Sequence, residues 1–103
     1  MIKVKQEKGR ITVSGHAGYA PIGQDIVCAA FSAVLQTFIS SVEELTTDEI
    51  KTDMTAGNAV IEYEALSEAA QLLMKSFFIG VHGIAAGYPE HITVTDCHGL
   101  TKH

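Results

Sequence analysis

The sequence predicts an α+β fold, a two-layer sandwich in which two helices pack on one face of a mostly antiparallel sheet. Three observations support this. Short stretches alternate apolar and polar residues as strands do, two longer stretches repeat apolar residues every three to four positions as helices do, and Gly, Asn and Pro separate them. The resulting order is ββαββαβ. At 103 residues the chain is expected to form a single domain, residues 1–103.

The chain begins with a predicted hairpin. Residues 2–6 and 11–14 alternate apolar and polar side chains, with Lys8 and Gly9 between the two stretches. The side chains expected on the buried face are Ile2, Val4, Ile11 and Val13.

A loop, residues 17–24, leads from this hairpin to the first predicted helix. Asp25 is a favourable N-cap, and the helix is expected from residue 26 to about 42. Ala30, Leu35 and Ile39 widen its apolar surface beyond one face, which indicates a second burial partner and favours a dimer. The apolar stripe itself consists of Val27, Phe31, Val34, Phe38 and Val42.

The second half repeats the pattern. Residues 49–54 and 59–64 read as a hairpin around residues 55–58, and Ser67 can cap a helix over residues 68–86. Gly87 and Pro89 end this helix, and residues 91–96 form a last strand, with Ile92 and Val94 inward. The core positions expected in the second helix are Leu73, Phe77, Val81 and Ile84.

Composition narrows the function classes. The net charge of −5 argues against direct nucleic-acid binding, and the acidic stretch at residues 43–53 is either a solvated surface or attractive to a basic peptide. With two cysteines, no signal peptide and no apolar run that reads as a membrane span, a cytoplasmic location is expected. No cofactor and no metal are expected, because the available side chains lack chelating spacing: His82, His91, Cys97, His98 and His103.

Residues 15–28 contain the candidate catalytic residues. Cys28 falls in the first turn of the predicted helix, where the helix dipole and unpaired amides favour a thiolate and could receive an oxyanion. His16 could take the thiol proton, and Asp25 and Ser32 lie near the same helix face, where either could orient His16 or contact substrate. Strict alternation would turn His16 away from the helices, so the strand has to end or bend near Gly15. Equally, a single cysteine in an apolar helix is often only a small buried hydrophobe.

The same segment resembles the signature of the ribosomal-processing cysteine protease family, Prp. The resemblance rests on GHAGYA at 15–20, Gly23, DIVCAA at 25–30 and Ser32, and extends to the length and element order of the whole chain. It implies a cysteine endopeptidase, a hydrolase with Cys28 as nucleophile and His16 as general base, and Asp25 and Ser32 in supporting roles.

The resemblance further implies a substrate and an assembly. Family members are homodimers that remove a short N-terminal extension from a bacterial large-subunit ribosomal protein, number twenty-seven, so a ribosomal protein precursor is the expected partner. The loop, with Gly18, Tyr19 and Gly23, would close over the peptide, and an apolar groove is expected beside it. The alternative is a non-catalytic dimeric module that binds a ribosomal protein or assembly factor, with Cys28 merely buried.

Overall fold

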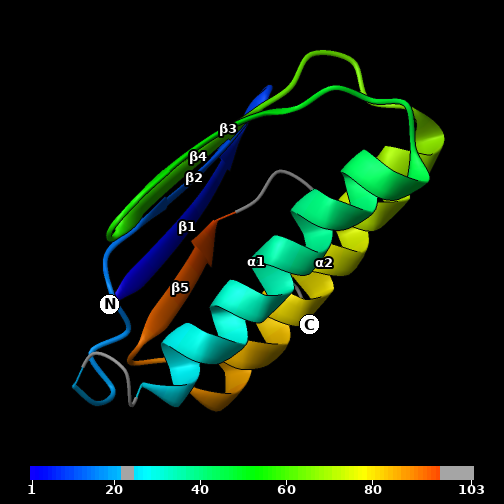
Figure 1. Cartoon of the computed structure of the whole chain (residues 1–103). Helices are drawn as coiled ribbons and strands as arrows, with labels where there is room; N and C mark the ends of the chain where they lie inside the picture. The colour runs from blue at the N-terminus through cyan, green and yellow to red at the C-terminus, as the bar shows by residue number, and fades with distance from the viewer. Residues whose placement is uncertain (22–24, 96–103) are drawn as a thin grey trace.

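The computed structural model describes residues 1–21 and 25–95 (Figure 1). The elements follow the predicted order and lie within a few residues of the predicted bounds. They are β1 (Ile2–Glu7), β2 (Arg10–Ser14), α1 (Ile26–Leu45), β3 (Lys51–Thr55), β4 (Asn58–Glu62), α2 (Glu68–Gly87) and β5 (Ile92–Thr95).

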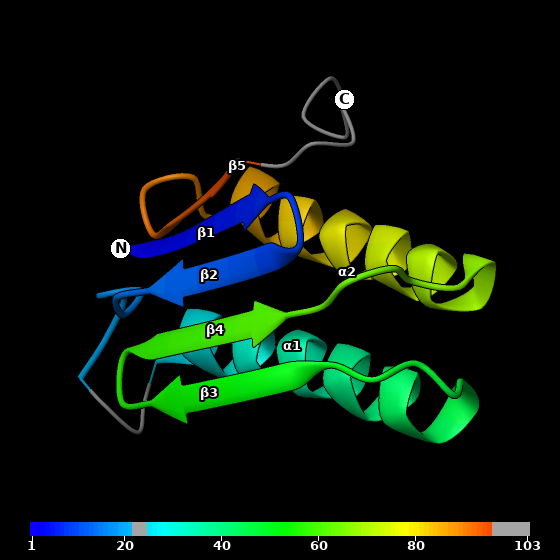
Figure 2. The same ribbon diagram turned by 90° about the horizontal axis from the view of Figure 1, so that it is seen from above.

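The strands form a five-stranded sheet in the order β3-β4-β2-β1-β5. Three neighbouring pairs are antiparallel, and β5 alone runs parallel to its neighbour, β1 (Figure 2). This arrangement confirms the predicted α+β class and the mostly antiparallel sheet. The parallel pair follows from the chain path, because β5 is reached through α2 rather than through a hairpin.

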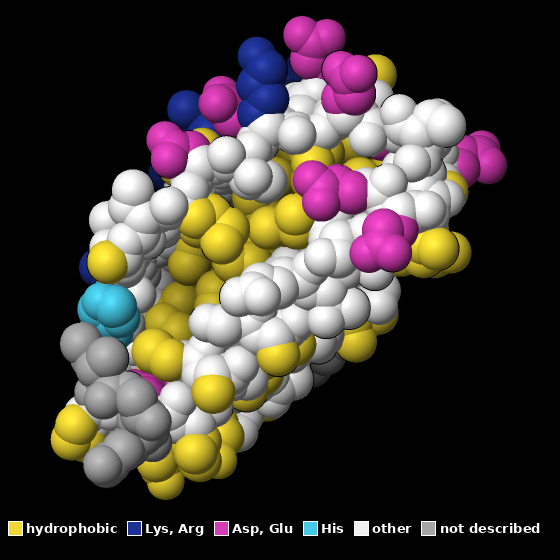
Figure 3. Space-filling view, viewed as in Figure 1, with side chains coloured by type: hydrophobic (Ala, Val, Ile, Leu, Met, Phe, Trp, Pro, Cys, Tyr) yellow, Lys and Arg dark blue, Asp and Glu magenta, His cyan; other side chains and the backbone are white. Residues whose placement is uncertain are grey.

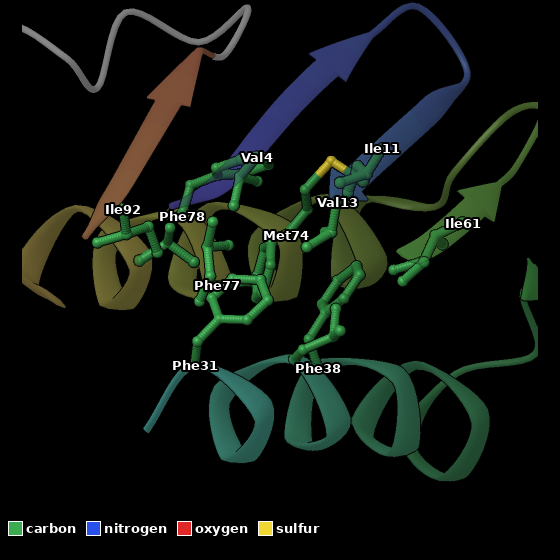
Figure 4. Packing of buried hydrophobic residues seen from close by; sticks show 14 of the residues in the cluster. Val4, Ile11, Val13, Phe31, Phe38, Ile61, Met74, Phe77, Phe78 and Ile92 are labelled. Atoms are coloured by element: carbon green, nitrogen blue, oxygen red, sulfur yellow. The ribbon is translucent and has the colours of Figure 1, made fainter. Parts of the chain in front are cut away.

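Both helices lie on the same face of the sheet, and the core fills the space between the two layers (Figures 1 and 4). The predicted inward residues of the first hairpin, Ile2, Val4, Ile11 and Val13, are all buried. Between the layers, the Phe77 ring stacks on Phe38 at a centroid distance of 5.0 Å and meets Phe78 edge-on at 5.0 Å. Because the helices and all strands except β3 contribute buried residues, a single core holds the two layers together.

The hairpin turns explain where the strand pairs form. Gly9 connects β1 to β2 and Gly57 connects β3 to β4, and both have a φ of +77°. Such a backbone conformation strains any residue with a Cβ, so these two glycines fix where each chain reversal occurs.

Side-chain caps define both helix starts, as predicted. Asp25 accepts backbone hydrogen bonds at the start of α1. At the start of α2 the hydroxyl of Ser67 accepts from the Ala70 N–H at 3.2 Å and donates to Asp48 at 2.6 Å. The hydroxyl of Ser67 and, next, its backbone N–H hold the pKa of Asp48 below its ordinary value. Asp48 thus joins the segment between α1 and β3 to the start of α2.

Strand β3 is an open edge. Among the described strands it pairs only with β4, and all five of its residues are exposed. Polar side chains such as Lys51, Thr52 and Asp53 are typical of an unpaired edge, because they discourage unwanted strand pairing.

The wide apolar surface of α1 does not by itself indicate a dimer, contrary to the sequence-based expectation. Leu35, expected to face a second copy, is 5% exposed within this chain's own core, and Ile39 packs against that core. Only Ala30 of the three remains exposed. The sequence pattern misled because α1 packs against both the sheet and α2, which together cover more than one face. The homodimer itself stays a prediction.

By length and composition alone, α1 and α2 are each apolar enough to cross a membrane, although core helices of soluble proteins pass the same test. Here each helix turns a row of buried residues toward the shared core. The sequence-based prediction that no segment spans a membrane stays a prediction.

Candidate active site

Cys28 is the third residue of α1 and carries a free, half-buried thiol. The backbone N–H of Ala17 donates a hydrogen bond to its Sγ at 3.2 Å. A thiol is a weak acceptor, whereas a thiolate carries a full charge that such a donor stabilises. The Ala17 amide is therefore a donor that reaches the sulfur from outside helix α1.

Asp25 holds the start of α1 and the preceding segment together. Its Oδ1 accepts from the N–H groups of Val27 and Cys28, both at 3.0 Å, and its Oδ2 accepts from the N–H of Tyr19 at 3.0 Å. Burial raises the pKa of Asp25, but backbone hydrogen bonds from Cys28, Tyr19, Ala20 and Val27 outweigh it, so the net pKa is lowered. Near neutral pH the side chain is a carboxylate.

In this structure, backbone amides at the helix start that were expected to hold an oxyanion already have acceptors on Asp25. The amides of Val27 and Cys28 already donate to the Asp25 carboxylate, and the Ala29 N–H donates to the Asp25 carbonyl at 3.0 Å. The capping charge also offsets the positive end of the helix dipole close to the sulfur. The Ala17 amide, which comes from outside the helix, is the donor that the structure places on Cys28 Sγ.

His16 follows the bend that the sequence required. Strand β2 ends at Ser14 and Gly15 adopts a φ of +88°, so the predicted break in alternation is confirmed. The imidazole is exposed and rests over the β3–β4 turn, where a methyl group on Gly57 would lie 3.1 Å from His16 Nε2. Within residues 1–21 and 25–95, no hydrogen bond joins His16 to Cys28.

The backbone nevertheless keeps His16 near the sulfur. The Ala17 nitrogen that donates to Cys28 Sγ is two covalent bonds from His16 Cα. The candidate base and the candidate nucleophile are therefore neighbours in space, although they are twelve positions apart in sequence.

The first residues of the loop are held rather than free. Gly18 has a φ of +71°, and the Tyr19 ring meets Tyr88 edge-on at 5.6 Å and His91 at 5.3 Å. Tyr19 is also 46% exposed, so part of the residue remains accessible to solvent. Gly23, the third predicted loop residue, lies outside the described residues.

Within the described residues, no hydrogen bond joins Ser32 or Asp25 to His16. Ser32 is exposed one turn after Cys28, and its hydroxyl forms no hydrogen bond in the described part of the chain. The Asp25 carboxylate is occupied by backbone amides. A direct role for either in orienting His16 has no support in the geometry, and contact of Ser32 with substrate stays a prediction.

Two residues at the site were missed by sequence reasoning. Gly57 lies beneath the His16 imidazole, and His91 donates from Nδ1 to the carbonyl of Ala17 at 2.9 Å. The predicted turn at 55–58 marked Gly57 only as a hairpin residue, and His91 was considered only as a metal ligand. Neither sequence position indicates what the fold places beside it.

No cluster of three or more metal-ligating side chains occurs in the residues that the structure describes. Of the side chains considered for a metal, Cys97, His98 and His103 lie outside those residues.

A hollow with apolar side chains on its floor opens between the β3–β4 edge and α1, with acidic side chains gathered toward one end (Figure 3). At the end where α1 leads into β3, a pocket of about 830 Å³ is lined by Ile50, Lys51, Tyr63 and several carboxylates. These acidic residues are Glu43, Asp48, Glu49, Glu62 and Glu64.

Comparison with known proteins shows which family the chain resembles. The family described as cysteine protease Prp matches residues 1–93. The ribosomal processing cysteine protease Prp of Staphylococcus aureus is 30% identical over 92 residues, 84% of this chain and 87% of that protein. The protein of the same name from Mycoplasma pneumoniae is 30% identical over 98 residues, covering 93% and 95%.

A solved structure extends the likeness to three dimensions. The crystal structure of the ribosomal processing protease Prp from S. aureus, in complex with a covalently linked product peptide, gives a TM-score of 0.86. Its sequence is 26% identical, and the match covers 94% of this chain and 100% of that one. The family match over residues 1–93, the similar relatives and the shared fold all indicate the same family. The chain belongs to the ribosomal processing cysteine protease family, Prp.

Proposed function

We propose that this chain is a Cys28/His16 endopeptidase that removes the N-terminal extension from the precursor of a bacterial large-subunit ribosomal protein, number twenty-seven. The observation that carries the proposal is the hydrogen bond from the Ala17 N–H to Cys28 Sγ at 3.2 Å, next to His16. The S. aureus relative, with its covalently linked product peptide, supports the same chemistry here.

In the proposed reaction, the Cys28 thiolate attacks the scissile carbonyl and a carbon–sulfur bond forms. Protonated His16 gives its proton to the departing amine as the carbon–nitrogen bond breaks. Water, which loses a proton to His16, then attacks the thioester and releases Cys28. Because the His16 ring rests over Gly57, it has to turn toward the sulfur when substrate binds. Catalytic contacts of this kind often tighten only in the substrate complex.

The surface suits a peptide with apolar and basic parts. The apolar hollow between the β3–β4 edge and α1 would take the aromatic-rich stretch before the cleavage site, as the family resemblance implies (Figure 3). The carboxylates of the neighbouring pocket would attract basic segments of a ribosomal precursor. The proposal includes a homodimer working in the cytoplasm, where reducing conditions keep Cys28 a free thiol.

The decisive experiment is incubation with the ribosomal precursor, followed by intact-mass analysis. We expect cleavage by the native protein and by Cys97→Ala, and none by Cys28→Ala or His16→Ala, with all four folded by circular dichroism. Equal cleavage by Cys28→Ala would refute the assignment. Binding of the precursor without cleavage by any variant would favour the non-catalytic dimeric module.

A further inference from the structure

Ala17 is held at both of its backbone polar groups. Its N–H donates to Cys28 Sγ at 3.2 Å, and its carbonyl accepts from His91 Nδ1 at 2.9 Å. Its side chain is 2% exposed and belongs to the core cluster. The position of the amide that reaches the sulfur is therefore set partly by His91, a residue 74 positions away in sequence.

His91 is itself firmly placed by the fold. It precedes β5, its N–H donates to the Tyr88 carbonyl at 2.9 Å, and its carbonyl accepts from the Ile2 N–H at 2.9 Å. Its ring meets Tyr19 edge-on at 5.3 Å, and Tyr19 in turn meets Tyr88 at 5.6 Å. These contacts attach His91 to β1, to the end of α2 and to the loop, so it provides a rigid support for Ala17.

The geometry also identifies the hydrogen on the ring. A carbonyl oxygen carries no proton, so the 2.9 Å contact with Ala17 requires that His91 Nδ1 be the donor. A side-chain amide at the same position offers the same kind of donor, whereas an aliphatic side chain offers none.

We propose that His91 is a positioning residue for the protease reaction, acting by holding the Ala17 amide on the sulfur of Cys28. This inference rests on the proposed function of Cys28. A hydrogen bond stabilises a developing charge only when its donor is already in place, because otherwise the backbone has to reorganise during the reaction. Loss of the His91 contact frees the Ala17 carbonyl and lets the amide move away from the sulfur.

The test compares three substitutions with the native protein. His91→Leu removes the donor. His91→Asn retains an N–H near the place of Nδ1, and His91→Gln carries its amide farther out, near the place of Nε2. The substrate is a synthetic peptide with an aromatic-rich stretch before its cleavage site, and kcat and KM are measured separately. A second readout is the rate at which iodoacetamide alkylates Cys28 near neutral pH, followed by mass spectrometry.

For His91→Leu and His91→Gln we expect kcat and the alkylation rate to fall about tenfold, with KM within about twofold, the loss typical of one hydrogen bond to a charged group. His91→Asn should keep both rates within about threefold of native. If His91→Leu does not fold, the contrast between His91→Asn and His91→Gln carries the test alone. A kcat unchanged in His91→Gln, or equally reduced in His91→Asn and His91→Gln, would overturn the proposal.

The two proposals fail in different ways. If the native protein does not cleave the peptide, the proposed function fails, while alkylation still reports whether His91 holds the amide on the sulfur. If the native protein cleaves and the His91 variants match it in both readouts, only the positioning role fails.

Discussion

Asp25 connects the start of α1 to the loop that precedes it. One carboxylate oxygen caps α1 and the other accepts from Tyr19 in the loop. The same side chain therefore fixes the direction in which the helix presents Cys28 and the place where the loop begins. Sequence reasoning identified the cap correctly, because Asp is a common N-cap, but nothing in the spacing indicated the second attachment.

The lowered pKa of Asp25 predicts how the stability of the protein depends on pH. Its pKa in the folded protein is lowered, so its stabilising contribution is fully present above the ordinary value of 3.8 and is lost as the pH falls below it. We expect Asp25→Asn to unfold at a lower urea concentration than native at pH 7, with the difference shrinking at pH 3. Asp53→Asn, on the exposed edge strand, is the control and should match native at both values. An undiminished difference at pH 3 would contradict the assigned charge.

The contact between Gly57 and His16 can be tested by substituting Gly57. Gly57 and Gly9 share a φ of +77°, and a Cβ on either would meet a neighbour at 3.1 Å: His16 Nε2 for Gly57 and the Tyr63 carbonyl for Gly9. Alanine at each position should cost a similar free energy of unfolding, about 1–2 kcal/mol. Only Gly57→Ala touches the candidate base: the added methyl group narrows the space in which the His16 ring turns toward the sulfur, so kcat should fall about tenfold or more.

Gly9→Ala provides the matched control for that comparison, because it adds a Cβ at the same φ of +77° in the other hairpin turn, where the nearest atom is the Tyr63 carbonyl oxygen. Its kcat should stay within about twofold of native. Equal kcat values for the two variants, measured with the same peptide, would show that the contact with Gly57 does not position His16.

At the scale of helices and strands, sequence periodicity predicted every described element. Packing between the layers determines which residues of each element are buried. The stripe expected in α2 is confirmed at Phe77 and Val81, whereas Leu73 and Ile84 are only partly buried. Met74 and Phe78 are buried instead. A helical repeat fixes an apolar face to within about one residue, and only packing against α1 and the sheet selects which residues lie at its centre.

Substituting Phe78 tests how much the packing of α2 contributes to the stability of the fold. It is 0% exposed and packs edge-on against Phe77 at the layer interface. We expect Phe78→Ala to lower the free energy of unfolding by about 3–5 kcal/mol, because it removes a buried ring and leaves a cavity. Ser76→Ala, exposed on the same helix, should change it by less than about 0.5 kcal/mol. Urea titrations followed by circular dichroism check both, and a loss for Phe78→Ala no larger than for Ser76→Ala would place Phe78 outside the core.

Only some of the residues at the site could be located from the sequence. The signature at 15–28 located Cys28, His16 and Asp25, because these lie close together along the chain. It could not locate Gly57 or His91, because both reach the site through the strand order β3-β4-β2-β1-β5. That order places the β3–β4 turn beside the end of β2 and the start of β5 beside the start of β1. Long-range pairing of this kind depends on the whole fold rather than on local pattern.

At the scale of the whole molecule, charge is unevenly distributed. The basic residues Lys3, Lys5 and Arg10 are exposed on β1 and β2, whereas carboxylates line the pocket between the end of α1 and the start of β3. A net charge of −5 therefore describes neither surface. A basic partner would be attracted to the acidic end of the apolar hollow, close to the open edge of β3.

The predicted homodimer also belongs to this scale, and the structure moves its expected interface from α1 to α2. Leu72 and Ile79 are 68% and 62% exposed, and their spacing of seven residues places them on one helix face. A second copy would remove this apolar stripe from water, which exposed leucine and isoleucine favour. We therefore expect the native protein to sediment as a dimer, and Leu72→Asp with Ile79→Asp to sediment as a folded monomer.

Leu45→Asp is the control for this prediction, because Leu45 is 72% exposed but lies at the end of α1. It introduces the same charge at a similarly exposed leucine, so it should leave the dimer intact at all concentrations tested by analytical ultracentrifugation. Dissociation by Leu45→Asp alone would place the interface at the end of α1. A native protein that stays monomeric at high concentration would remove the second copy altogether, and the exposed stripe on α2 would then need another partner.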